Sequence, residues 1–357
     1  MMTKWDLRPY LDDLEERIDD AEETALFEAW RTFAHGEHAG EELFAPTRSK
    51  HRPPAVEWPR IWVNDALVDL DAMILQQLGS ASALLASGSG RLMAARANYG
   101  SSIMATLFGA ASFVMERDLD TLPTSFPVPE RDLRRAIDAG VPDLRTGQGA
   151  LVLDGGAYFK EKLAGYPKIM RHVHVYHPDT QGPIDVVELI RGPSLFEEAY
   201  SDPEFVHALL SLVTSTYIAF LREWAAIWPF RADGVEVHWG LMHRGAVMLR
   251  EDSAMNFSGA MFDEFMRPYD QRVLDEFGGG AIHFCGHGDH FIDRAASMSG
   301  LHAINMSQPH LNDMEKIYRA TIDRGIVLID FPDQAARAAL DAGRALHGRV
   351  HVERRLP

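Results

Sequence analysis

The sequence predicts an α/β protein whose fold is a TIM-type (β/α)8 barrel, and three observations carry this prediction. After Gly90, short apolar runs alternate with segments of helical period, which is typical of a parallel sheet with crossover helices. The last of these runs follow one another without a linker, which favours closure into a barrel over an open sheet. The 357 residues are 46% hydrophobic, which is enough for one large core. We therefore expect a single domain over residues 1–357.

Residues 1–90 are expected to form an N-terminal helical cap and a crossing segment, and residues 91–357 the barrel. Apolar residues between Leu11 and Phe33 recur every three or four positions, which predicts one amphipathic helix. Residues 45–59 contain four prolines and predict an irregular crossing, followed by a second helix near 67–85.

The barrel strands are predicted where apolar runs end in polar or glycine-rich clusters. They lie near residues 92–98, 172–176, 235–238, 247–250, 282–285, 303–306, 326–329 and 350–352. Helices are expected between them near 203–227, 260–277, 289–297, 312–323 and 334–346. The helix that begins at Pro203 has the clearest start, because Ser201 and Asp202 offer a cap and Glu204 an acid in the first turn.

Composition limits the class of partner. The formal charge of -17 would repel a phosphate backbone and an anionic lipid surface, so we expect neither nucleic acid nor a membrane as partner. A single cysteine cannot form an internal disulfide, which suits the cytoplasm. Residues 1–16 lack the basic start and apolar run of a signal peptide, and no stretch approaches the roughly 20 apolar residues of a membrane span. These features predict a cytoplasmic protein that acts on a small molecule.

In such barrels the reacting groups lie at the carboxyl ends of the strands, and His283 and Cys285 are the strongest candidates there. Residues two apart on a strand point to the same face, so both side chains would enter the barrel mouth. Imidazole and thiolate together suit zinc. The alternative is a buried cysteine that packs as a small hydrophobe beside a hydrogen-bonded histidine. His287, in the loop that follows, can bind metal, contact a substrate or belong to the next helix start.

Two further groups of candidates follow predicted strands. Glu251 and Asp252 come after an apolar run, and adjacent acids face opposite sides, so one of them should reach the cleft as a general acid or base or a metal ligand. A helix cap or a surface ion pair is the alternative. His174 and Tyr176 alternate to one face and are expected to act on or position the substrate.

The remaining candidates are polar residues that follow the other predicted strands. Residues 177–183 form a turn rich in polar groups, which can hold a substrate or serve as a structural corner. Asp330 follows the strand near 326–329 and is a candidate metal ligand. The residues expected to bind substrate are Asn98, Tyr99, His177, Gln181, His238, Asn305 and Gln308.

Several of these segments resemble a known superfamily. Asn256, residues 261–265, the pair Pro268 and Tyr269, residues 282–286, and Ile304 with Asn305 look like the C-terminal half of the uroporphyrinogen decarboxylase and cobamide methyltransferase superfamily. The resemblance covers at least residues 179–330, and its order of elements implies the barrel. Three more segments look like a less characterised bacterial branch, namely residues 96–100, 107–109 and 177–183.

The methyltransferase branch implies a zinc site that activates a thiol, with methyl drawn from or given to a corrinoid. Its members hold zinc with an H-x-C pair and a later cysteine, and His283 and Cys285 match the pair. Because Cys285 is the only cysteine, a carboxylate or imidazole must supply the third ligand. The candidates are Glu251, Asp330, His238 and His287. A corrinoid protein as partner and a homodimer are further expectations from the resemblance.

The resemblance leaves two other functions open. Porphyrinogen decarboxylases grip substrate carboxylates with an N-terminal arginine-rich segment of the R-Q-A-G-R-Y type, which this sequence lacks, although Arg52 and Arg60 lie in that region. The second function is therefore a cofactor-free decarboxylase of a tetrapyrrole or another polycarboxylate. The third is a non-catalytic corrinoid or tetrapyrrole binder.

Overall fold

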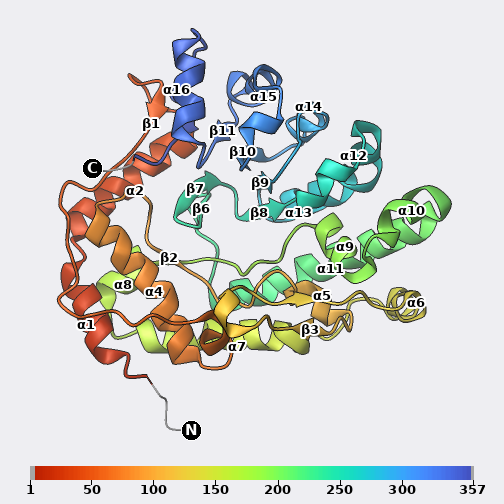
Figure 1. The fold of residues 1–357 in the computed structure, drawn as a ribbon, viewed down its shortest axis with the longest axis horizontal. Coiled ribbons are helices and arrows are strands. Elements are labelled where there is room, and N and C mark those ends of the chain that lie inside the picture. Colours follow the sequence, from red (N-terminus) through yellow and green to blue (C-terminus); the bar gives the residue numbers. More distant parts are fainter. Residues whose placement is uncertain (1–4, 355–357) are drawn as a thin grey trace.

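A six-stranded parallel sheet forms the centre of the molecule, and helices surround it (Figure 1). The structure is a computed structural model and describes residues 5–354, so the first four residues of the segment screened for a signal peptide lie outside it. The order in the sheet is β1 (Leu43–Phe44), β12 (Val350–His351), β11 (Val327–Leu328), β10 (Leu301–Met306), β9 (Gly280–Phe284) and β8 (Val247–Arg250). A separate parallel pair joins β2 (Ala94–Ala95) and β5 (His174–Val175).

The predicted mixed α/β fold with a parallel sheet is confirmed, whereas no hydrogen-bonded ladder within residues 5–354 closes it into a full barrel. Between β5 and β8 a side chain spans the gap, because the Met248 backbone N–H donates to Nε2 of His177 at 3.4 Å. Arg250 and Asp179 form an ion pair across the same gap, with Nε and Oδ1 3.0 Å apart. Side chains thus replace strand pairing at this point of the ring.

One predicted strand is wrong in its pairing. Residues 235–238 form β6 (Val235–His238), which pairs antiparallel with β7 (Leu241–Arg244) and not in the parallel sheet. The turn between them is Trp239 and Gly240, whose φ angles of 54° and 77° give the left-handed pair that a two-residue hairpin requires. Strand β1, from the N-terminal segment, instead pairs in parallel with β12. A second short hairpin joins β3 (Ser112–Phe113) and β4 (Thr124–Ser125).

Helices occupy most of the rest of the chain. Those that precede β5 are α1 (Arg8–Arg17), α2 (Asp20–Ala34), α3 (Val63–Ala66), α4 (Leu70–Ser87), α5 (Ile103–Leu107), α6 (Glu130–Ala139), α7 (Gly147–Leu163) and α8 (Pro167–His172). Those that follow are α9 (Pro183–Arg191), α10 (Ser194–Ser201), α11 (Pro203–Ile227), α12 (Gly259–Phe265), α13 (Arg267–Glu276), α14 (Ile292–Ala295), α15 (Met314–Ala320) and α16 (Asp333–Asp341). Short 3-10 turns are η1 (Arg117–Leu119), η2 (Asp252–Asn256), η3 (Pro309–Leu311) and η4 (Ile322–Arg324).

Two helices predicted as continuous are broken in the structure. The helix expected from Leu11 to Phe33 divides between α1 and α2, because Asp19 adopts an extended conformation and its carboxylate caps α2 by accepting from two backbone N–H groups. The helix expected over 260–277 divides at Met266, one residue before the first turn of α13, which contains Pro268. Helical periodicity continues across both breaks, so the pattern alone did not reveal them.

Alternate residues of the parallel strands face two different cores. Ile282, Ile304 and Leu328 pack outward against the helices, in the larger cluster. Their neighbours Ala281 and Ala303 face the interior of the ring. Helix α2 and the β6–β7 hairpin fill this interior, and β7 contacts β9, β10 and α2. Figure 1 shows the hairpin near the centre of the ring. The same alternation continues toward the carboxyl ends of the strands. The next inner side chains are therefore polar ones such as His283 and Asn305, and they lie at the end of the sheet that we call the mouth.

Helix α11 is long and apolar enough to cross a bilayer, with a mean hydropathy of 1.5, so the expectation that no stretch approaches a span is wrong on length and composition. Within the molecule, however, 61% of that apolar stretch is buried. The helix packs against α7, α9 and α13. It therefore serves as a core helix of this fold.

Candidate metal centre

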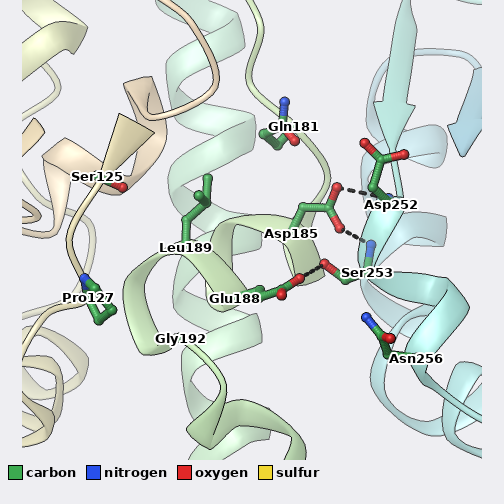
Figure 2. A pocket seen from close by; sticks show the side chains of 10 residues that line it. All are labelled: Ser125, Pro127, Gln181, Asp185, Glu188, Leu189, Gly192, Asp252, Ser253 and Asn256. Atoms are coloured by element: carbon green, nitrogen blue, oxygen red, sulfur yellow. Dashed lines mark hydrogen bonds between the residues drawn. The ribbon is translucent and has the colours of Figure 1, made fainter. Parts of the chain in front are cut away.

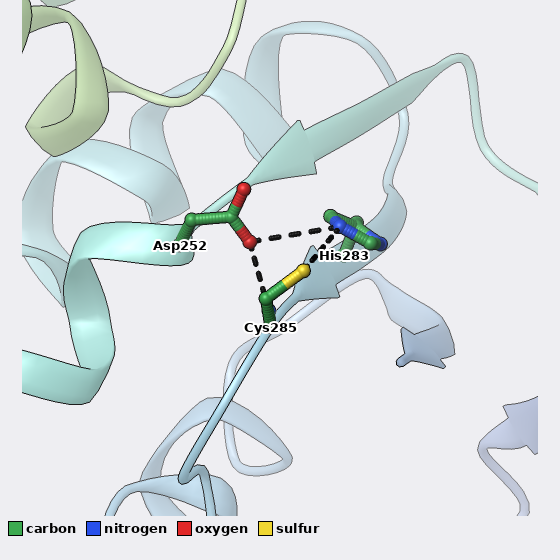
Figure 3. A group of neighbouring side chains, drawn as sticks. All are labelled: Asp252, His283 and Cys285. Atoms are coloured by element: carbon green, nitrogen blue, oxygen red, sulfur yellow. Dashed lines mark hydrogen bonds and ion pairs between the residues drawn. The ribbon is translucent and has the colours of Figure 1, made fainter. Parts of the chain in front are cut away.

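Three potential ligand atoms meet at the mouth, where β8 and β9 end (Figure 3). Cys285 Sγ lies 3.5 Å from Nε2 of His283, and the same Nε2 lies 3.6 Å from Oδ1 of Asp252. All ligand atoms of the group lie within 4.8 Å of one another. His283 and Cys285 therefore do point to the same side, as the strand alternation predicted.

The hydrogen bonds of Asn305 place a hydrogen on Nδ1 of His283. The Asn305 side-chain N–H donates to the carbonyl of Ile329 at 2.8 Å, which sets the amide orientation and leaves Oδ1 as an acceptor. His283 Nδ1 lies 2.6 Å from this oxygen and must donate to it. With the hydrogen on Nδ1, Nε2 is the ring nitrogen left to face Cys285 and Asp252 as a potential ligand atom. This arrangement, with the far ring nitrogen held by an acceptor, is the one found in metal-binding histidines.

The distances fit a tetrahedral zinc ion. With a Zn–S bond of about 2.3 Å and a Zn–N bond of about 2.0 Å, a tetrahedral angle places the two donor atoms roughly 3.5 Å apart. The Sγ to Nε2 distance in the group is 3.5 Å. Thiolate, imidazole and carboxylate form a donor set that zinc accepts, and three protein ligands leave one position for a substrate. The residues present therefore fit zinc.

The charge state of the free cysteine agrees with a site that needs a cation. Burial raises the pKa of the Cys285 thiol, and the Asp252 carboxylate raises it further, while a hydrogen bond to the Ser307 hydroxyl opposes the shift. Without a cation the sulfur therefore remains a thiol at neutral pH. A divalent ion reverses this balance, because a coordinating thiol loses its proton.

Asp252 is positioned by Asp185 of α9, which the sequence analysis did not single out. The Asp185 carboxylate accepts from the backbone N–H of Asp252 at 3.0 Å and of Ser253 at 2.8 Å, so it caps the 3-10 turn that carries the ligand. Burial raises the pKa of Asp185 to about 7. In turn, the backbone N–H of Cys285 donates to Oδ1 of Asp252 at 2.8 Å, which ties this turn to β9.

A pocket of about 460 Å³ opens beside Asp252, between α9 and η2 (Figure 2). The side chain of Asp252 is 47% exposed, so the group is accessible from this side. Gln181, a predicted substrate-binding residue, lines the same pocket. Its φ of 60° places it in the left-handed region, and its amide donates to Asp179 at 2.6 Å.

Glu251 lies on the opposite side of the chain from Asp252, as expected for adjacent acids. Its side chain is fully buried against Asp270 of α13, and within residues 5–354 neither carboxyl has a hydrogen-bond partner outside this pair. Burial, followed by repulsion from Asp270 and Asp185, raises the pKa of Glu251 well above its usual range. The pair therefore holds a proton inside the fold. Glu251 does not belong to the group of residues that forms the candidate metal centre.

Neither Asp330 nor His287 belongs to the group, although both were predicted as ligands. Asp330 forms an ion pair with Arg91 and lines a separate pocket near the ends of β11 and β12. His287 is exposed in the loop after Cys285. Asp252, one of the two acids expected to reach the cleft as a general acid or base or a metal ligand, supplies the third potential ligand atom of the group.

The other predicted residues divide between loop supports and distant positions. Gln308 accepts from the backbone N–H of Gly286 at 2.5 Å and so holds the loop after Cys285. His174 stacks on Phe27 of α2, and burial lowers its pKa to about 3. Tyr99 packs near Gly155 of α7, away from the group. Asn98 has a buried Oδ1 without a hydrogen-bond partner.

Tyr176, His177 and His238 form a second polar cluster at the mouth. Their rings are in contact, with centroids 5.2 Å apart for Tyr176 and His238 and 4.3 Å apart for His177 and His238. Arg250 belongs to this cluster too, and it escaped the sequence analysis because it ends an apolar run. Its guanidinium stacks on Trp239, 4.6 Å from the ring centroid.

The two N-terminal arginines do not reach the mouth. Arg52 forms ion pairs with Asp19 and Glu22. Arg60 is exposed, pairs with Asp120 and stacks on a neighbouring tryptophan. The expectation that arginines of this region grip substrate carboxylates therefore lacks support in the geometry.

Replacing Asn305 with leucine is expected to weaken zinc binding about 10- to 100-fold, because the tautomer and orientation of His283 are no longer fixed. Competition with a chromophoric chelator measures this affinity. Asn305→Asp, which keeps an acceptor for Nδ1, should bind zinc within a few-fold of the wild type, as should Asn256→Leu in the nearby pocket. Equal affinities of Asn305→Leu and the wild type would show that Asn305 does not position a metal-binding His283.

Fold and site together define a mixed α/β protein with a parallel sheet and a candidate metal centre at the carboxyl ends of its strands. No family model matches the chain, and no curated protein matches it. Among solved structures it is similar to a methyltransferase from Methanosarcina mazei, with 14% sequence identity, a TM-score of 0.61 and 92% of each chain covered. At this identity the likeness shows a shared fold.

Proposed function

We propose that this protein is a zinc-dependent methyltransferase that moves a methyl group between a corrinoid and a thiol or similar acceptor. The observation that carries the proposal is the group of Asp252, His283 and Cys285, whose donor atoms are spaced for a tetrahedral ion. A structural neighbour over 92% of the chain is named a methyltransferase, which agrees with this choice.

A bound zinc supplies positive charge that keeps a thiol acceptor deprotonated near neutral pH. The sulfur lone pair then attacks the methyl carbon, a new S–C bond forms, and the bond from carbon to the donor breaks with its electron pair left on the donor. Asn305 orients His283, and Asp185 orients Asp252, so two of the side chains that would hold the zinc are fixed relative to the pocket beside α9. The thiol proton leaves toward solvent on the exposed side of Asp252.

Partners and compartment follow the same proposal. The acceptor is a small molecule, and the corrinoid arrives free or on a corrinoid protein. We place the reaction in the cytoplasm, because the site depends on a lone cysteine that an oxidising compartment would modify. The proposal includes a homodimer. It includes neither nucleic acid nor a membrane as partner, in keeping with the charge of -17.

The purified protein is expected to contain one zinc ion per chain and to methylate 2-mercaptoethanol from methylcobalamin. Elemental analysis measures the metal, and loss of methylcobalamin absorbance with mass spectrometry of the thioether measures transfer. Asp252→Ala should lose zinc and activity together. Asp330→Ala is the matched control, since Asp330 is an acid at the same end of the sheet but outside the group, and it should retain both. Transfer by the wild type after complete removal of zinc would overturn the mechanism.

A further inference from the structure

A buried cluster of positive charge lies beside the candidate metal centre. Arg250 has a side chain only 3% exposed, and its Nη1 and Nη2 have no hydrogen-bond partner among the described residues. Arg96 lies in the same cluster, 12% exposed. One acid, Asp179, serves both arginines, with its oxygens 3.0 Å from Nε of Arg250 and 3.2 Å from Nη1 of Arg96.

The histidines around these arginines are neutral, so they do not change the net charge of the cluster. Burial, followed by repulsion from charged neighbours that include Arg250, lowers the pKa of His177 to about 3 and that of His238 well below its usual range. Burial likewise lowers the pKa of His243 to about 4. All three are neutral at physiological pH. Two guanidinium groups and one carboxylate leave a net positive charge out of water, which is costly unless an anion pairs with it.

The cluster also contains an acceptor without a donor. His243 Nδ1 lies 2.9 Å from the carbonyl of Arg244 and must donate to it, so its Nε2 accepts from Nδ1 of His238 at 2.7 Å. His238 Nε2 is then an unprotonated nitrogen, and it is buried without a partner. Arg250 and Arg96 both act electrostatically on His238, so the unpaired donors and the unpaired acceptor share one region.

Trp239 contacts both this cluster and the candidate metal centre. Its ring centroid lies 4.6 Å from the Arg250 guanidinium and 5.4 Å from the ring centroid of His283. Arg250 and His283 are also paired residues of β8 and β9, so both project from the same level of the sheet. One small molecule can therefore contact Arg250 with one end while its other end faces the ligands.

We propose that Arg250, Arg96 and His238 form a binding subsite for an oxyanion that also carries a hydroxyl group, such as a hydroxycarboxylate or a monoprotonated phosphate. The oxyanion accepts from Nη1 and Nη2 of Arg250, and the hydroxyl donates to Nε2 of His238. The role of this anion as the remote end of the methyl acceptor rests on the proposed function, whereas its binding does not.

Calorimetry and thermal shift on metal-free protein, prepared with a chelator, test the subsite. Glycolate and inorganic phosphate should bind and raise the melting temperature, acetate should bind more weakly, and neutral glycolamide should have no effect at equal ionic strength. Binding of glycolate alone or phosphate alone assigns the subsite to a carboxylate or a phosphoryl group. No binding of either at millimolar concentration overturns the proposal, and leaves the zinc measurements on Asp252→Ala unaffected.

Variants assign the binding to particular side chains. Arg250→Met should weaken glycolate and phosphate binding about ten- to hundredfold, as expected for loss of charge-assisted hydrogen bonds. If that variant does not fold, Arg250→Lys should still weaken binding, because an ammonium lacks the planar pair of donors. His238→Phe should keep acetate binding but lose the preference for glycolate over acetate. Arg222→Met, at a surface ion pair with Glu276, is the control for net charge. Unchanged glycolate and phosphate binding in Arg250→Met and Arg250→Lys would refute the assignment.

Discussion

Replacing Cys285 with serine is expected to lower the affinity for zinc by on the order of a thousandfold, because a serine hydroxyl is a poor substitute for a soft thiolate ligand. Cys285 is the only cysteine of the chain, so no other thiol can take its place. Methyl transfer should fall with metal content. Zinc binding to the wild type should also release the thiol proton, since burial holds the pKa of Cys285 above its usual value in the free protein.

A neighbouring hydroxyl provides the control for this substitution. Ser307 Oγ lies 3.4 Å from Sγ of Cys285 but is not a donor atom of the group, so Ser307→Ala should change zinc affinity only slightly. Chelator competition measures both variants, and titration in a weakly buffered solution measures proton release. If Cys285→Ser keeps the wild-type affinity, the thiol belongs to the packing of β9 and not to a metal site.

Replacing both acids of the buried pair, in Glu251→Gln/Asp270→Asn, is expected to stabilise the protein relative to the wild type at pH 8 by about 5 kcal/mol, because each unit of pKa shift corresponds to about 1.4 kcal/mol. Burial raises the pKa of Asp270 from 3.8 to about 8, and that of Glu251 is raised as well. Between about pH 4 and pH 8 the carboxyl groups of the pair stay protonated in the folded protein but are ionised in the unfolded chain. The wild-type free energy of unfolding should therefore decrease as the pH rises from about 4 to about 8.

The gain of the double variant should accordingly be small near pH 4 and grow as the pH rises toward 8. Chemical denaturation across this range measures it, and comparison with the wild type cancels other titrating groups such as Asp185. Glu276→Gln, which removes a partly exposed acid of the same helix, should show no such trend. Parallel curves for the wild type and the double variant would mean that the pair is ionised in the fold.

Much of the fold was predictable because its signals are local. The expected strand 247–250 coincides with β8, and the helix expected over 203–227 coincides with α11, whose capping Asp202 and following proline are explicit in the sequence. The β6–β7 hairpin was missed because tryptophan is an unusual turn residue, and tertiary contacts hold Trp239 there: its ring packs against the inner core, and Arg91 donates to its carbonyl at 3.3 Å.

The metal centre was predictable in part. The spacing of His283 and Cys285 predicted that both side chains point to the same side, which supplies two of the three potential ligand atoms. The prediction held because the strand alternation continues one residue past the end of β9 at Phe284. Alternation also indicated that only one of Glu251 and Asp252 faces the cleft, but not which one. Strand β8 ends at Arg250 and a 3-10 turn starts at Asp252, so the period of two no longer applies there. The anchor of that turn, Asp185, lies far away in sequence, where no local pattern can identify it.

Trp239 has a consequence for how this protein can change over time. A left-handed backbone costs a residue with a side chain about 1–2 kcal/mol, and glycine at this position would escape that cost. Glycine would also remove the indole that lies between Arg250 and His283. Relief of the backbone cost therefore favours losing the ring, while the packing of the ring against the inner core and its contacts with the two proposed sites favour keeping it. Opposite effects on stability and on the two proposed sites therefore act on one residue, Trp239.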